Sequence, residues 1–71
     1  MSDSVYRVTE VIGTSPDGWE AAAANAVQTA GRSIRDLRVA EATRFDVTIQ
    51  DGKIADYRVR LNISFKYEAG D

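Results

Sequence analysis

Hydrophobic and polar side chains alternate along residues 57–67, which read YRVRLNISFKY. Because successive side chains of a strand point to opposite faces, this alternation predicts a strand with one apolar face and one polar, cationic face. The segment is roughly twice as long as a usual strand of about 5–6 residues. So long a strand in so short a chain indicates that its polar face also has a partner, which we expect to be another copy of the chain.

Two further elements precede this strand. The segment 4–12, SVYRVTEVI, is rich in β-branched residues and predicts a first strand. A helix is expected from about Pro16 to about Ser33, with Ser15 as its N-cap. One apolar stripe with helical spacing, mostly alanine, allows this helix to approach a sheet closely. The stripe consists of Trp19, Ala22, Ala23, Ala26, Val27 and Ala30, with Trp19 as a core or interface anchor.

A second strand is expected from about Arg38 to Ile49, joined to the last one by the two-residue turn Asp51–Gly52. The element order predicts an α+β fold of β-α-β-β type, a three-stranded antiparallel sheet packed on one helix, as one domain over residues 1–71. An uninterrupted hairpin on this turn pairs Ala40 with Ile63 and Ala42 with Leu61 on the apolar face. On the other face it sets the pairs Val39–Ser64, Glu41–Asn62, Thr43–Arg60 and Phe45–Arg58.

The second face of this sheet is expected to mix apolar and charged residues. It would carry Val39, Phe45, Val47 and Ile49 beside Glu41, Arg58, Arg60 and Lys66. A solvated face would not hold so many apolar side chains. The mixture predicts either a subunit interface with salt bridges or a ligand pocket built at such an interface, and the two interpretations are compatible.

Composition restricts the chemistry further. A chain of 71 residues leaves much of its surface wet, and small domains usually gain stability from disulfides, a metal or oligomerisation. The sequence has no Cys and no His, which excludes disulfides, thiolate metal sites and the commonest general base. The remaining sources of added stability are oligomerisation and a cation bound by oxygen ligands.

The charge pattern argues against several classes of function. The net charge of −2 gives no global attraction to nucleic acid, and the aromatic residues of the last strand are expected on the face opposite its cations. No apolar run is long enough for a membrane helix, so we expect a soluble, cytoplasmic protein without nucleic-acid or membrane partners. No nucleophile–base pair exists, and the strand acids Glu41 and Asp46 are expected on opposite faces. The sequence therefore predicts that the protein is not an enzyme.

The order of elements, the motif GTSPDGW at the helix start, the Asp51–Gly52 hairpin and the closing NISFKYE together resemble the dodecin family. The resemblance covers essentially the whole chain. It implies a hollow homododecamer of tetrahedral symmetry that stores or quenches ligands rather than catalysing a reaction. In most dodecins the ligand is a flavin, stacked in pairs near the threefold axes, and some also bind coenzyme A at subunit junctions.

The chain departs from the flavin-binding pattern of that family. The position of the Trp that stacks on the flavin ring holds Val39, and the position of a Gln that bonds the ring's polar edge holds Arg58. Val39 offers no aromatic plane, and Arg58 cannot accept a hydrogen bond from a ring N–H. The family pocket corresponds here to Val39, Glu41, Arg58 and Arg60, and flavin binding is expected to be weak or lost.

An Arg-Gly pair of the family falls on Asp46 and Val47. Two features resemble a calcium-associated branch of dodecins: the segment LRVAEA at residues 37–42, and Asp46 in place of that Arg. Carboxylates from several copies near a symmetry axis would suit Ca²⁺, which takes oxygen ligands. Asp46 is thus a candidate calcium ligand, or else a salt-bridge partner of Arg44 or of an arginine in another copy. The expected function is a binding shell for a small ligand or cation. The alternative is a flavin-storing dodecin with an altered pocket.

Overall fold

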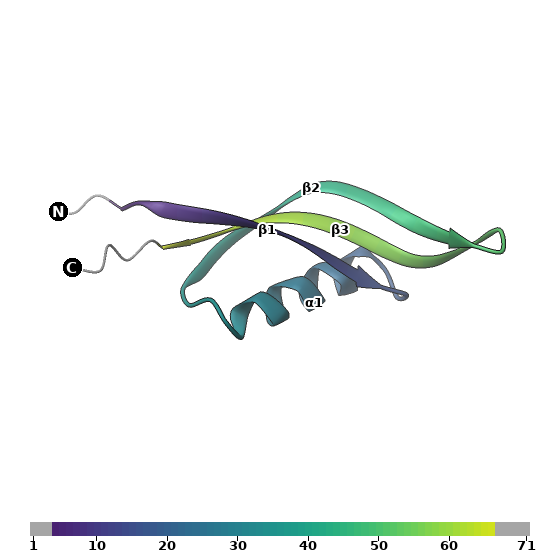
Figure 1. Ribbon diagram of the computed structural model, residues 1–71, viewed down its shortest axis with the longest axis horizontal. Coiled ribbons are helices and arrows are strands. Elements are labelled where there is room, and N and C mark those ends of the chain that lie inside the picture. Colours follow the sequence, from purple (N-terminus) through teal and green to yellow (C-terminus); the bar gives the residue numbers. More distant parts are fainter. Residues whose placement is uncertain (1–3, 67–71) are drawn as a thin grey trace.

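The computed structural model describes residues 4–66, which form three strands and one helix in the order β-α-β-β. The elements are β1 (Tyr6–Ser15), α1 (Trp19–Gly31), β2 (Leu37–Gln50) and β3 (Lys53–Lys66). Figure 1 shows a long, twisted sheet with the helix against one face, and a β2–β3 hairpin that reaches past the helix. The predicted α+β fold is confirmed, while Tyr67, the last residue of the predicted strand, lies outside the described residues.

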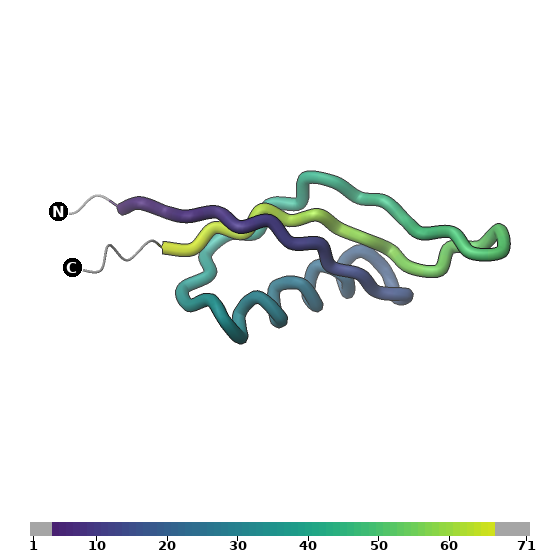
Figure 2. The backbone as a smooth tube through the Cα atoms, viewed as in Figure 1, coloured from purple at the N-terminus to yellow at the C-terminus, as the bar shows by residue number. Residues whose placement is uncertain are grey.

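The strand order is β1-β3-β2, so the alternating segment forms the centre of the sheet and is antiparallel to both neighbours. The tube in Figure 2 shows β1 running beside β3 although most of the sequence separates them. The first strand begins at Tyr6, two residues later than predicted, and continues through Ser15, three residues further than predicted. Because Ser15 is still part of β1, it is not the N-cap of the helix, which Gly18 occupies. Its hydroxyl instead accepts a hydrogen bond from the Asp17 amide at 3.0 Å.

The core forms where the alanine stripe of α1 meets the apolar face of β3. Its buried members are Ala22, Ala26, Ala30, Val59, Leu61 and Ile63. The small stripe residues let the helix approach β1 so closely that a Cβ on Gly13 would collide with the Ala22 carbonyl and lie 2.8 Å from the Ala26 Cβ. The predicted close approach of helix and sheet is therefore confirmed, and it depends on glycine at position 13.

The hairpin begins as the sequence predicts. Asp51 and Gly52 both have positive φ, of 54° and 76°, as a two-residue turn of type I′ requires. Gln50 faces Lys53 across it. At the far end of β2 the predicted pairs are also found: Val39–Ser64, Ala40–Ile63, Glu41–Asn62 and Ala42–Leu61.

Between these two ends the register shifts by one residue. Irregularities lie between Thr48 and Ile49 and between Ala42 and Arg44, and they compensate each other. The segment from Arg44 to Thr48, called here the shifted segment, pairs one position further along β3: Arg44–Arg60, Phe45–Val59, Asp46–Arg58, Val47–Tyr57 and Thr48–Asp56. The predicted pairs Thr43–Arg60 and Phe45–Arg58 are wrong, because the turn cannot reveal a bulge further along the strand.

A one-residue slip moves side chains to the other face of a sheet. Phe45 and Val47 therefore share the helix-side face with Val59 and Tyr57, instead of the second face predicted for them. Asp46 moves the opposite way and faces Arg58. It thus shares a face with Glu41, and the prediction that the two acids point to opposite sides is wrong. Within residues 4–66 no helix is long and apolar enough to cross a membrane.

Candidate functional site

The sheet face that turns away from α1, called here the open face, carries a charged cluster at its middle. On β3 its residues are those of even number, since the odd-numbered Val59, Leu61 and Ile63 lie in the core. The ladder places the charges in three rows across the sheet: Glu10–Asn62–Glu41, Ile12–Arg60–Arg44 and Thr14–Arg58–Asp46.

The strongest contact of the cluster joins Asp46 to Arg58. The guanidinium donates two hydrogen bonds to the carboxylate, from Nε to Oδ1 at 2.8 Å and from Nη2 to Oδ2 at 3.0 Å. The two side chains are 32% and 38% exposed. Hydrogen bonding from Arg58 lowers the pKa of Asp46, and the carboxylate in turn raises the pKa of Arg58. Such a bidentate pair fixes both side chains in one orientation.

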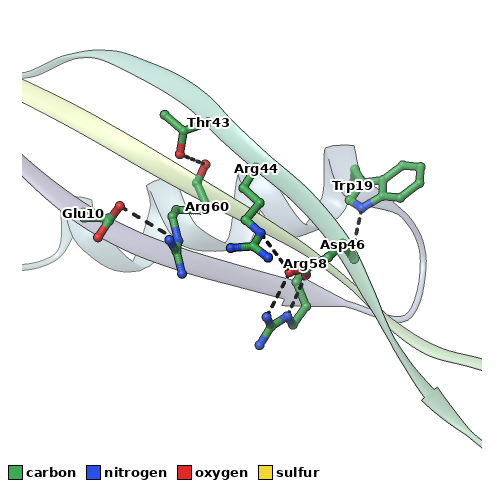
Figure 3. Close-up of polar contacts among 7 residues, drawn as sticks. All are labelled: Glu10, Trp19, Thr43, Arg44, Asp46, Arg58 and Arg60. Carbon is green, nitrogen blue, oxygen red and sulfur yellow. Dashed lines mark hydrogen bonds and ion pairs between the residues drawn. The ribbon is translucent and has the colours of Figure 1, made fainter.

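Two longer ion pairs extend the cluster on either side. Arg44 Nε lies 3.8 Å from Asp46 Oδ2, and Arg60 Nε lies 3.9 Å from Glu10 Oε2 on β1. Figure 3 shows the Asp46 carboxylate between the side chains of Arg44 and Arg58, with Glu10 reaching Arg60 from the neighbouring strand. Arg44 and Arg60 are register partners with the same charge, an arrangement that is unfavourable unless anionic groups lie nearby.

Threonine hydroxyls form hydrogen bonds with backbone groups at both ends of the shifted segment. Thr43 Oγ1 donates to the Arg60 carbonyl at 3.3 Å, and Thr48 Oγ1 accepts a hydrogen bond from the Asp56 amide at 3.1 Å. A bulge leaves backbone groups without their usual ladder partners. The two side chains supply partners at these points, so the shift is built into the sequence of β2 and β3.

Trp19 contacts the shifted segment from the start of α1. Its indole N–H donates to the Asp46 carbonyl at 3.1 Å. Its ring meets Phe45 edge-on, with centroids 5.9 Å apart, and meets Tyr57 in the same manner at 5.0 Å. Trp19 is therefore an anchor between helix and sheet, although its side chain is still 41% exposed.

The structure brings only some of the predicted site residues together. Arg58, Arg60 and Asp46 belong to the charged cluster. Val39 shares the open face but lies opposite Ser64, six residues from Arg58 along β3, or about 20 Å. One chain therefore cannot offer Val39 and Arg58 to the same small ring. Val39 borders a shallow hollow of about 270 Å³ lined by aliphatic side chains and Arg38.

Glu41 and Asp46 are the predicted site residues with carboxylates. Glu41 lies on the open face opposite Asn62, and no ion pair within residues 4–66 involves it. The same part of the chain brings no three His, Cys, Asp or Glu side chains together as a metal centre. A calcium site on Asp46 therefore needs donors of another kind or carboxylates from other copies, and Arg58 already donates to both oxygens of that carboxylate.

Sequence reasoning missed Glu10 and the role of Trp19. Glu10 lies between Val8 and Ile12 on the open face of the first strand. Because alternate residues share a face, its position in the sequence could have placed it near the polar face of β3. The contact between Trp19 and Asp46 gave no such signal, because the two residues are 27 positions apart in the sequence. Arg44 was considered as a partner of Asp46, and the structure confirms that contact at 3.8 Å.

Comparison with known proteins gives a consistent result. Residues 5–68 match the Dodecin family. The chain is 48% identical over 63 residues to a calcium dodecin from Mycobacterium tuberculosis, covering 89% of each protein. It is 34% identical over 64 residues to a dodecin from Thermus thermophilus, covering 90% of this chain and 93% of that protein.

Solved structures agree with the sequence matches. A dodecin from Streptomyces coelicolor superposes with a TM-score of 0.91 at 46% identity, covering 96% of this chain and 97% of that one. The calcium dodecin from Mycobacterium tuberculosis, described as calcium chelating with a novel calcium-binding site, gives a TM-score of 0.82 at 48% identity with the same coverage. Dodecins assemble as dodecamers and are small binding or storage proteins. By sequence and by fold, this chain belongs to the dodecin family.

Proposed function

We propose that this protein is a non-enzymatic binding shell. Twelve copies form a hollow homododecamer that holds a small ligand or a hard cation where subunits meet, and flavin binding is weak or lost. The observation that carries the proposal is the charged cluster of the open face. In this cluster Arg58, at a position of the family's flavin pocket, is bound to Asp46, at the position of the family's Arg-Gly pair.

The open face supports an assembled state. Large apolar side chains are exposed there beside the charges, with Val8 63%, Ile12 47% and Val39 62% exposed. A face with both properties suits a subunit boundary, where apolar contact excludes water and ion pairs set the orientation. The cytoplasmic location expected from the sequence stays a prediction.

Weak flavin binding is expected from the two residues, Val39 and Arg58, that occupy flavin-binding positions of the family. The position of the stacking Trp is Val39, which has no aromatic plane and lies opposite Ser64. Arg58 is held by two hydrogen bonds to Asp46, so binding a ring edge would first have to break them. Stacking of a ring on an aromatic side chain contributes about 1–3 kcal/mol, and this chain forgoes it.

Calcium is the cation that we propose for Asp46. The support is twofold: a relative 48% identical to this chain is called calcium dodecin, and Asp46 is an ionised carboxylate on an exposed face. Because one chain supplies too few carboxylates, the site draws on several copies. Ca²⁺ then competes with Arg58, and its binding should depend on assembly.

A calcium titration monitored by thermal melting tests this proposal. Calcium should raise the melting temperature of the native assembly relative to chelator, because a ligand that binds only the folded form stabilises it. Asp46→Asn should reduce the shift. Asp51→Asn is the matched control, since it removes one carboxylate at the hairpin turn, away from the cluster, and should leave the shift intact. The absence of a calcium-dependent shift in the native protein would refute the calcium site.

The alternative, flavin storage in an altered pocket, has one observation in its favour. Val39 and Arg58 lie on the same sheet face, so neighbouring copies could combine them into one pocket. Fluorescence titration with riboflavin separates the two functions. We expect at best weak binding by the native protein and tighter binding by the double variant Val39→Trp/Arg58→Gln, with the Val39→Leu/Arg58→Gln variant as the control without an aromatic plane. Submicromolar affinity of the native protein would favour flavin storage.

A further inference from the structure

Asp46 faces Arg58 in the charged cluster only because the shifted segment departs from the register that the hairpin turn sets. In an uninterrupted ladder, Asp46 would face Tyr57 and Phe45 would face Arg58. In the structure Asp46 faces Arg58 and Phe45 faces Val59. The shift therefore exchanges an aromatic ring for a carboxylate on the open face. Some interaction must favour this register, since an irregularity interrupts the ladder at each end of the shifted segment.

One ring contact of Trp19 depends on the shifted register. Its ring meets Phe45, which reaches the helix side only when the segment is shifted. Its other ring partner, Tyr57, is the residue that Val47 faces in this register. A contact that one of two arrangements makes and the other lacks shifts the equilibrium toward the first. The Phe45 contact has this property, so Trp19 favours the shifted register.

The indole hydrogen bond of Trp19 also acts on the shifted segment. The Trp19 N–H donates to the carbonyl of Asp46, the residue whose side chain binds Arg58 on the opposite face. The bond thus holds the backbone at the centre of the shifted segment, while Thr43 and Thr48 hold its two ends. Figure 3 shows the indole directed at the Asp46 backbone and the carboxylate directed at the arginines.

We propose that Trp19 is the positioning residue of the candidate site: from the start of α1 it fixes the register of residues 44–48, and it thereby aims Asp46 at Arg58 on the open face. This inference rests on the proposed function, in which that pair belongs to the ligand site. It makes the first residue of the helix, which does not itself belong to the charged cluster, a determinant of which charges the open face presents.

A double-mutant cycle measured in different backgrounds tests the proposal. Asp46→Asn, Arg58→Gln and the double variant are compared by thermal unfolding in the native background, with Trp19→Leu, and with Val27→Ala. In the native background the two changes should be non-additive, because the residues are in contact. With Trp19→Leu the coupling should disappear. With Val27→Ala, which destabilises the half-buried helix packing without touching the shifted segment, it should persist.

A crystal structure of the Trp19→Leu protein gives the register directly. We expect Asp46 opposite Tyr57 and Phe45 on the open face. If Trp19→Leu does not fold, Trp19→Phe serves instead, because it retains a smaller aromatic ring and removes the N–H donor, and it should show reduced coupling. Unchanged coupling together with an unchanged Asp46–Arg58 pair in a folded Trp19 variant would overturn the proposal. All measurements are made without calcium or flavin, so their outcome is independent of whether the proposed ligands bind.

Discussion

The two faces of the central strand β3 are held by different forces. On the helix side, Val59, Leu61 and Ile63 are at most 2% exposed and pack against a stripe of alanines. On the open side, Arg58 and Arg60 remain 38% exposed and make ion pairs with the flanking strands. Burying a large aliphatic side chain contributes about 1.5–3 kcal/mol, whereas an ion pair that remains exposed contributes much less, because water screens it.

This difference separates stability from specificity. The helix-side face specifies the fold. Removing its side chains leaves cavities in a packed core, and enlarging them causes collisions. The open face tolerates changes of charge, so it can differ between members of one family without loss of the fold. In this chain, the charged residues proposed to hold a ligand are therefore expected to contribute less to stability than the core does. The following experiments test the comparison, from the largest expected effect to the smallest.

Gly13→Val should have the largest effect. A Cβ at this position would collide with the Ala22 carbonyl on the backbone of α1, so the helix could not dock on β1. We expect no folded protein in circular dichroism or solubility assays. Thr14→Val places the same side chain one residue further on, toward the open face, and should fold normally. A stable Gly13→Val protein would show that the close approach of helix and sheet is dispensable.

Leu61→Ala should come next. The side chain is 2% exposed, and truncating a buried leucine typically costs about 2–5 kcal/mol. Asn62→Ala, its neighbour on the open face, should change the free energy of unfolding by about 0.5 kcal/mol or less. Chemical denaturation at a fixed protein concentration measures both, since assembly contributes to apparent stability. Equal losses for the two variants would contradict the separation between the faces.

The effect of Asp46→Asn on stability should depend on pH. The Arg58 hydrogen bonds hold the pKa of Asp46 below its ordinary value of 3.8, so this group stabilises the native state above that value and the stabilisation is lost as pH falls through the native pKa. Near neutral pH the variant should melt below the native protein. The difference should shrink in acid below pH 3.8. A difference that does not change with pH would mean that the ion pair contributes nothing and that Asn acts by another route.

Glu10→Gln should have the smallest effect. The Glu10 carboxylate is 58% exposed and lies 3.9 Å from Arg60, so we expect a loss of about 0.5 kcal/mol or less. Raising the salt concentration should remove the difference between the variant and the native protein, since exposed charges are screened. A large, salt-independent loss would indicate that Glu10 is buried by another copy in the assembly.

The sequence was sufficient for much of the fold. Alternation along β3 placed Val59, Leu61 and Ile63 on one face, helical spacing gave the alanine stripe, and Asp51–Gly52 fixed the turn. These features are local, because each depends on the geometry of a single strand, helix or turn. The family resemblance rested on such local motifs and is confirmed.

The sequence by itself therefore determined the elements, their order and the buried face. Tertiary structure decided which charges meet on the open face, because a one-residue shift within β2 moved Asp46 beside Arg58 and turned Phe45 toward the helix. Such a shift depends on the balance between ladder hydrogen bonds and contacts from another element, here Trp19 on α1. A side chain 27 positions away in the sequence leaves no periodic signal in the strand that it positions.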